Sequence, residues 1–201
     1  MVSSTTERRS KLLARGFLLE YITLGWNVVG IAVLAITALR ARSVALAGFG
    51  LDSLIEIGAS IVVVWELRGT GERRRQFALR LIASAFIALA IYLFLQSTAV
   101  LVTRFRPEPS LGGIAWTAVT AVAMFGLAWG KKRTGRALNN PVLRTEGRVT
   151  MVDGILAFAV LVGLALNATL GWWWADPLAG YVLVFYGARE AWQILRAEHS
   201  P

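Results

Sequence analysis

The stretch Ser43–Leu67, SVALAGFGLDSLIEIGASIVVVWEL, decides the fold, because it is long and apolar enough to cross a bilayer as one helix. Asp52 and Glu56 nevertheless lie near its middle. Four residues apart on a helix, their carboxylates project from one face, about 6 Å apart along the axis. A lone carboxylate at that depth costs roughly 2.5–3.5 kcal/mol, and two on one face also repel each other. A positive partner is therefore expected between them.

The composition of the whole chain indicates an integral membrane protein. Of its 201 residues, 56% are hydrophobic and 16% are charged, whereas a soluble domain carries roughly 25% charged residues. The absence of cysteine excludes disulfides, thiolate metal sites and thiol catalysis. The net charge of +9 is interpreted as a topology signal, so no nucleic-acid partner is expected. No enzymatic activity is expected either, since no Ser/His/Asp set, phosphate loop or metal-hydrolase spacing occurs.

Six apolar segments of roughly 20 residues are predicted to be transmembrane helices, since a 30 Å hydrocarbon core requires that length. They cover residues 16–39, 43–67, 77–102, 112–130, 146–170 and 177–195. The predicted fold is an all-α membrane protein, a six-helix bundle forming one domain over residues 16–195. Residues 1–15 are expected to be a basic cytoplasmic lead, 131–145 the longest loop and 196–201 a short cytoplasmic tail. Asp176 and Pro177 are predicted to start the sixth helix, as its N-cap and first helical residue.

The distribution of Lys and Arg predicts the orientation. Of 21 such residues, only Arg40, Arg42, Arg104 and Arg106 fall on the links that follow the first and third predicted spans. By the positive-inside rule, both termini are predicted to be cytoplasmic. We expect a multi-pass protein of the plasma (inner) membrane.

The remaining basic residues are interpreted as determinants of this topology. The clusters at Arg73–Arg75 and Lys131–Arg133 are also expected to contact anionic lipid headgroups. The single histidine, His199, is interpreted as a surface residue of the tail. These residues are therefore not expected to bind metal.

The orientation places several polar residues near the bilayer midplane. Counting 1.5 Å per residue, Asp52 lies roughly 13 Å, Glu56 roughly 19 Å and Asp153 roughly 18 Å from the outer boundary. Asn27 falls close to the same plane, where a structural hydrogen bond between helices explains it equally well. No Lys, Arg or His is expected at that depth. The carboxylates are therefore either protonated or paired with a bound cation, and a protein that uses both states is a cation/proton exchanger.

Two further acidic residues form a shallower layer. Glu20 and Glu146 lie about one turn above the predicted cytoplasmic boundary. Glu20 precedes Asn27 by seven residues, and Glu146 precedes Asp153 by seven, so each pair shares a helix face within about 20°. We interpret Glu20 and Glu146 as a cytoplasmic entrance or second metal site, from which a path leads to the midplane acids.

Two stretches resemble the cation diffusion facilitators, six-helix transporters of zinc and related divalent metals. SVALAGFGLDSLIEIGAS resembles their second span, which carries two acids four residues apart in a setting like ADALDSLxD. VTMVDGILAFAVLVGLALNATLGWWWADPLAG resembles their fifth span, WxxDP-type turn and sixth span. The resemblance implies metal ligation by Asp52, Glu56 and Asp153.

The chain departs from that family in three ways. Val149 stands where the family has His or Asp, and Glu56 where it has Asp. No cytoplasmic C-terminal domain follows the last span, so we expect a short, divergent branch limited to the transmembrane domain. Without the histidine, the fourth ligand is expected to be Thr150, Asn27 or water. A shell of oxygen ligands weakens the selection of zinc over Mn²⁺, Co²⁺ or Fe²⁺.

The sequence therefore predicts a secondary transporter that exports a divalent transition metal in exchange for protons, and zinc is the metal expected first among the candidates. No cofactor is expected, and the many small residues in the spans favour close helix packing and a homodimer. One alternative is a proton-coupled exporter of organic cations, in which Phe49, Trp26 and Tyr21 would supply cation–π contacts. Another is a membrane sensor or assembly subunit that transports nothing.

Overall fold

The structure is a computed structural model that describes the backbone except at residues 1, 68–71, 140 and 199–201. Side chains are described at residues 7, 9–58, 80, 83–139, 143–144 and 147–196. The predictions made for the side chains of Glu146, Arg73–Arg75 and His199 lie outside the described residues.

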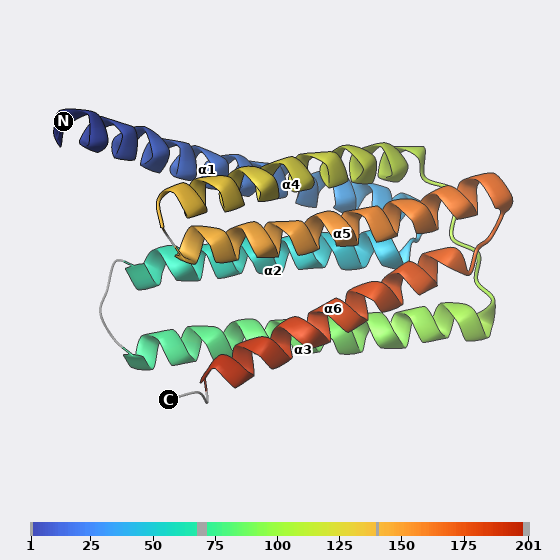
Figure 1. The fold of residues 1–201 in the computed structure, drawn as a ribbon. Helices are drawn as coiled ribbons and strands as arrows, with labels where there is room; N and C mark the ends of the chain where they lie inside the picture. Colours follow the sequence, from blue (N-terminus) through green and yellow to red (C-terminus); the bar gives the residue numbers. More distant parts are fainter. Residues whose placement is uncertain (1, 68–71, 140, 199–201) are drawn as a thin grey trace.

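The described part of the chain consists of six α-helices and contains no strand (Figure 1), as predicted. The helices are α1 (Val2–Ala41), α2 (Val44–Leu67), α3 (Glu72–Thr103), α4 (Leu111–Ala137), α5 (Pro141–Leu170) and α6 (Ala175–Glu198). Helix α1 pairs with α2, α3 with α6, and α4 with α5. The all-α, six-helix prediction is therefore confirmed.

The helices run up and down along one common direction (Figure 1). Helix α1 begins and α6 ends at the same end of the bundle, called here the terminal end. The links from α1 to α2, from α3 to α4 and from α5 to α6 lie at the opposite, far end. In the described residues, four stretches are long and apolar enough to cross a membrane: Arg9–Ala41, Ala83–Thr103, Leu111–Ala137 and Gly147–Leu170. The crossing of the membrane by α2 and α6 remains a prediction.

Glycines allow α4 and α5 to approach each other closely near the terminal end. A Cβ atom on Gly135 of α4 would lie 2.9 Å from the backbone nitrogen of Arg144. A Cβ atom on Gly147 of α5 would lie 3.0 Å from the backbone nitrogen of Lys132. Since real Cβ atoms rarely come so close to backbone, both positions require glycine for this packing.

Two helices extend further than the apolar pattern indicated. Helix α4 continues to Ala137, so the loop predicted over residues 131–145 is confined to the short link between α4 and α5. Lys and Arg are good helix formers, so the helix does not end where the apolar run ends. Helix α1 likewise includes residues of the predicted polar lead.

The apolar core fills the half of the bundle nearest the far end. It includes Leu34 of α1, Leu46 and Phe49 of α2, Leu93 of α3 and Val160 of α5, all buried. On α1, α2 and α5, these residues lie on the far-end side of Asn27, Asp52 and Asp153 respectively. The midplane polar residues therefore begin where this core stops.

A buried carboxylate joins α6 to α2 at the far end. Asp176, fully buried, accepts hydrogen bonds from the Ser43 hydroxyl and, at 3.1 Å, from the Val44 backbone N–H. The Ser43 oxygen accepts in turn from the Leu46 N–H at 3.1 Å. Helix α6 begins at Ala175, so Asp176 lies in its first turn and caps the N-terminus of α2 instead. The predicted N-cap role of Asp176 on its own helix is therefore wrong.

Candidate cation site

Three carboxylates come together between α2 and α5. One oxygen each from Asp52, Glu56 and Asp153 can be chosen so that all three lie within 4.8 Å of one another. Asp52 and Asp153 are buried, and Glu56 is partly buried. These are the three residues that sequence reasoning placed at one depth, and the structure brings them together.

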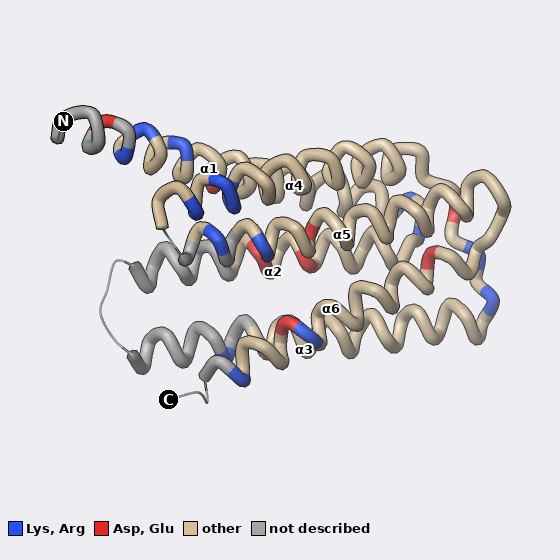
Figure 2. The backbone as a smooth tube through the Cα atoms, in the orientation of Figure 1, with Lys and Arg blue, Asp and Glu red and all other residues tan. Residues whose placement is uncertain are grey.

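The two helices present these acids to each other for simple reasons. Asp52 and Glu56 are four residues apart, so both project from one face of α2. Asp153 comes from α5, which contacts α2. The next residue, Gly154, faces α4, where an added Cβ would lie 2.9 Å from the Phe125 ring. The close approach of α4 at Gly154 thus leaves the neighbouring Asp153 to face α2. Figure 2 shows acidic segments of α2 and α5 side by side, away from the basic residues of the far end.

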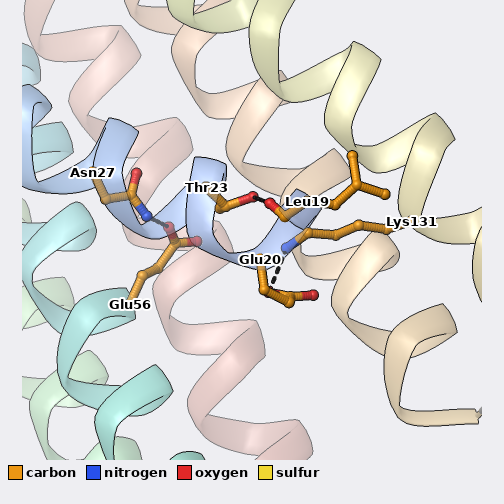
Figure 3. A network of polar contacts seen from close by, with 6 residues as sticks. All are labelled: Leu19, Glu20, Thr23, Asn27, Glu56 and Lys131. Atoms are coloured by element: carbon orange, nitrogen blue, oxygen red, sulfur yellow. Dashed lines mark hydrogen bonds and ion pairs between the residues drawn. The ribbon is translucent and has the colours of Figure 1, made fainter. Parts of the chain in front are cut away.

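Asn27 of α1 completes one side of the cluster. Its Nδ2 atom donates a hydrogen bond of 3.0 Å to Oε2 of Glu56 (Figure 3). Asn27 is 6% exposed, so this bond lies inside the protein. In this geometry Asn27 orients Glu56 through its amide nitrogen, whereas a metal ligand has to offer an oxygen lone pair.

Two positions before Asp153 bear on the fourth ligand, and they differ in burial. Thr150, three residues before Asp153, is buried. Val149, where the family has His or Asp, is 39% exposed. Val149 lies four residues before Asp153, about 40° away around the helix, and Thr150 lies about 60° away. Both positions are therefore near the face of α5 that carries Asp153, and of the two only Thr150 offers an oxygen.

One oxygen of the cluster has no hydrogen-bond partner. In the part of the chain that the structure describes, Oδ1 of Asp153 is buried and accepts no hydrogen bond. An unpaired buried carboxylate oxygen is costly unless a proton or a cation satisfies it. The cluster thus has the chemistry of a site that holds either.

Glu20 is already engaged by a lysine. The Nζ atom of Lys131 on α4 lies 2.9 Å from Oε2 of Glu20 on α1 (Figure 3). Lys131 is only 1% exposed, so the expectation that it contacts lipid headgroups is wrong. The apolar run of α4 ends just before Lys131, and its position in the sequence does not reveal which way the side chain points. The sequence did contain a signal for this ion pair, because counting residues along the helices puts Glu20 and Lys131 close to the same membrane boundary.

The aromatic residues considered for an organic cation have other contacts. The Trp26 ring stacks on Trp116 of α4 at 5.3 Å, and its N–H donates to Thr120 at 3.1 Å. Tyr21 is 69% exposed, and Phe49 is buried in the apolar core. These contacts do not favour an aromatic cage around the carboxylates.

Residues 20–200 match the cation efflux transmembrane domain. The chain belongs to the cation efflux family. The resemblance to cation diffusion facilitators is thereby confirmed. Because this domain is a membrane domain and four helices are apolar enough to cross a bilayer, the protein is an integral membrane protein.

Two curated proteins are similar to this chain over much of its length. The chain is 30% identical over 148 residues to an uncharacterized transporter of Synechocystis sp., and the aligned part covers 68% of this chain and 47% of that protein. It is 24% identical over 192 residues to transmembrane protein 163 of Xenopus laevis, and this alignment covers 90% of this chain and 66% of that protein. The chain thus spans about half the length of the first relative and 66% of the second.

Proposed function

We propose that this cation transporter exports a divalent transition metal in exchange for protons. Of the candidate metals, we propose zinc rather than Mn²⁺, Co²⁺ or Fe²⁺. The observation that carries the proposal is the buried cluster of Asp52, Glu56 and Asp153, whose oxygens lie within 4.8 Å of one another. Membership of the cation efflux family supports a metal cation as substrate.

The spacing of the cluster suits a small divalent ion. Zinc binds carboxylate oxygens at about 2.0–2.2 Å, so two oxygens of one tetrahedral shell lie about 3.4 Å apart. The three oxygens here lie within 4.8 Å of one another, so side-chain movements of about 1 Å bring them onto one ion. Thr150, Asn27 or water is proposed to complete the shell. Since all these donors are oxygens, Mn²⁺, Co²⁺ and Fe²⁺ are expected to bind as well.

Proton exchange follows from charge balance. A divalent cation and protons compete for the same carboxylate oxygens. The buried Oδ1 of Asp153, which has no hydrogen-bond partner among the described residues, supports this competition because a proton or a cation would satisfy it. Binding of metal therefore releases protons, and protons displace metal. The apolar core between the cluster and the far end blocks direct passage, so release there requires a rearrangement of the helices.

The proposed direction is from the terminal end, taken as cytoplasmic, to the far end in the plasma (inner) membrane. Lys and Arg are concentrated at the terminal end (Figure 2), which supports this orientation. The chain contains no cysteine, so a single cysteine placed at residue 108 or residue 7 reports its side with a membrane-impermeant thiol reagent. Labelling of intact cells at residue 7 and not at 108 would reverse the orientation.

Transport itself is tested in proteoliposomes with an imposed pH gradient. Asp52→Asn and Asp153→Asn are expected to abolish metal-driven proton movement, because each removes a charge from the cluster. Glu108→Gln, an exposed acid on the far-end link, is the matched control and should leave the flux unchanged. Unchanged flux in both aspartate variants would overturn the assignment. A homodimer, proposed from the many small residues in the spans, is tested by the mass of the purified protein in detergent.

A further inference from the structure

Glu20, which pairs with the buried Lys131, lies on α1, the helix that also carries Asn27. Glu20 precedes Asn27 by seven residues on α1, which is about 10 Å along the axis and nearly one helix face. Asn27 binds Glu56 of the cluster, and Glu20 binds Lys131 (Figure 3). Thr23 lies between them, but its hydroxyl donates to the Leu19 carbonyl and joins neither contact.

Lys131 points from the terminal end toward the interior of the protein. Side chains on a helix lean toward its N-terminus, and α4 begins at the far end. Its side chain is only 1% exposed, so the ammonium group lies inside the protein and projects toward the level of the cluster. A lysine side chain reaches about 6 Å from its backbone on a flexible stem, so loss of Glu20 would let the ammonium group turn toward Glu56 and Asp153.

The two acidic layers predicted from the sequence differ in net charge as a result. Glu20 and Lys131 together are neutral, whereas Asp52, Glu56 and Asp153 form a group of three carboxylates. Among the described residues, the net negative charge is therefore in the midplane layer of Asp52, Glu56 and Asp153 and not at Glu20. A cation on its way to the cluster meets a neutral pair at Glu20 rather than a free carboxylate.

We propose that Glu20 is a positioning residue that sequesters Lys131, an intramolecular cation that otherwise competes with the transported metal for the carboxylate cluster. Glu20 thus acts on the cluster through Lys131 and is not itself an entrance ligand. The proposal rests on the proposed function of the cluster. It predicts that loss of Glu20 harms metal binding only while Lys131 keeps its charge.

A double-mutant cycle separates this role from that of a ligand. The four proteins are the wild type, Glu20→Gln, Lys131→Met and Glu20→Gln/Lys131→Met, each purified as the full chain, with Zn²⁺ affinity measured by competition with a chelator. Glu20→Gln is expected to weaken Zn²⁺ binding by about tenfold or more, because the freed ammonium turns to the cluster. Lys131→Met and the double variant are expected to bind within about threefold of the wild type.

The surface pair of Glu7 and Lys11 is the matched control. Its charged atoms lie 2.7 Å apart, but both side chains are largely exposed. The cycle Glu7→Gln, Lys11→Met and the double variant should leave Zn²⁺ affinity unchanged throughout. Glu20→Asp, which keeps the charge, should restore much of the affinity that Glu20→Gln loses.

The outcomes are distinguishable from a failure of the proposed function. If the wild type binds no divalent metal, the proposed function is wrong, and the inference with it. If the wild type binds Zn²⁺ but the double variant is at least about tenfold weaker than Lys131→Met, Glu20 is a ligand and the inference alone is overturned. This last comparison needs no folded Glu20→Gln protein, and thermal unfolding shows that the proteins compared are intact.

Discussion

Removal of the Asp176 carboxylate tests whether the far-end junction positions the helix that carries two of the three acids. Asp176 binds the Ser43 hydroxyl and the Val44 N–H in a fully buried setting. Asp176→Ala leaves both donors without an acceptor, and each buried unsatisfied donor costs about 1–3 kcal/mol. Part of this cost is offset because a buried charge disappears. We therefore expect a loss of about 2–4 kcal/mol in the free energy of unfolding.

Asp176→Asn separates shape from charge at this position. It keeps one acceptor oxygen and loses the favourable interaction of a carboxylate with the N-terminus of α2, so about half the loss is expected. Asp52 lies eight residues beyond Val44, about 12 Å along α2. A loosened start of α2 should therefore also weaken metal binding by about threefold or more.

The assay is thermal unfolding in detergent, followed by the helical circular dichroism signal, together with Zn²⁺ affinity for each variant. Glu108→Ala, an exposed acid at the same end of the bundle, is the control and should unfold like the wild type. If Asp176→Ala unfolds at the wild-type temperature and binds Zn²⁺ with wild-type affinity, the junction does not position α2 and this reasoning is refuted.

Two further predictions concern the shell around the carboxylates. Val149→His is expected to tighten Zn²⁺ binding by about tenfold, because position 149 lies four residues before Asp153 on nearly the same face of α5 and a histidine there adds a nitrogen ligand. Calorimetry with Zn²⁺ checks this, and wild-type affinity in the variant would show that a side chain at 149 does not reach the carboxylates. Asn27→Ala is expected to weaken Zn²⁺ binding by about threefold to tenfold, because Glu56 loses the amide that orients it. Wild-type affinity in that variant would show that the bond is only structural.

The fold and the carboxylate cluster follow from information that a sequence carries directly. Six apolar runs of bilayer length predict six helices, and distance along a helix predicts depth in the membrane. Asp52, Glu56 and Asp153 fall at one depth by this count, and the structure brings them together. Burial of acids is also so costly that three at one depth have few explanations.

Rotation about the helix axis and the identity of the neighbouring helix do not follow from such counting. Lys131 ends an apolar run, and only the packing of α4 against α1 shows that it faces Glu20 rather than lipid. Asp176 looks like the cap of its own helix, yet the returning chain places it against the start of α2. The exposure of Val149 likewise depends on how α5 is turned in the bundle.

The most direct test of the central claim is the number of Zn²⁺ ions bound per chain, measured by equilibrium dialysis on the purified protein. The wild type and Glu108→Gln should each bind one ion at the cluster, with release of protons. Asp153→Asn should bind none at the same free Zn²⁺ concentration, because it loses a carboxylate whose Oδ1 has no hydrogen-bond partner among the described residues. Binding of one ion by Asp153→Asn with wild-type affinity would contradict the assignment of the cluster as the cation site.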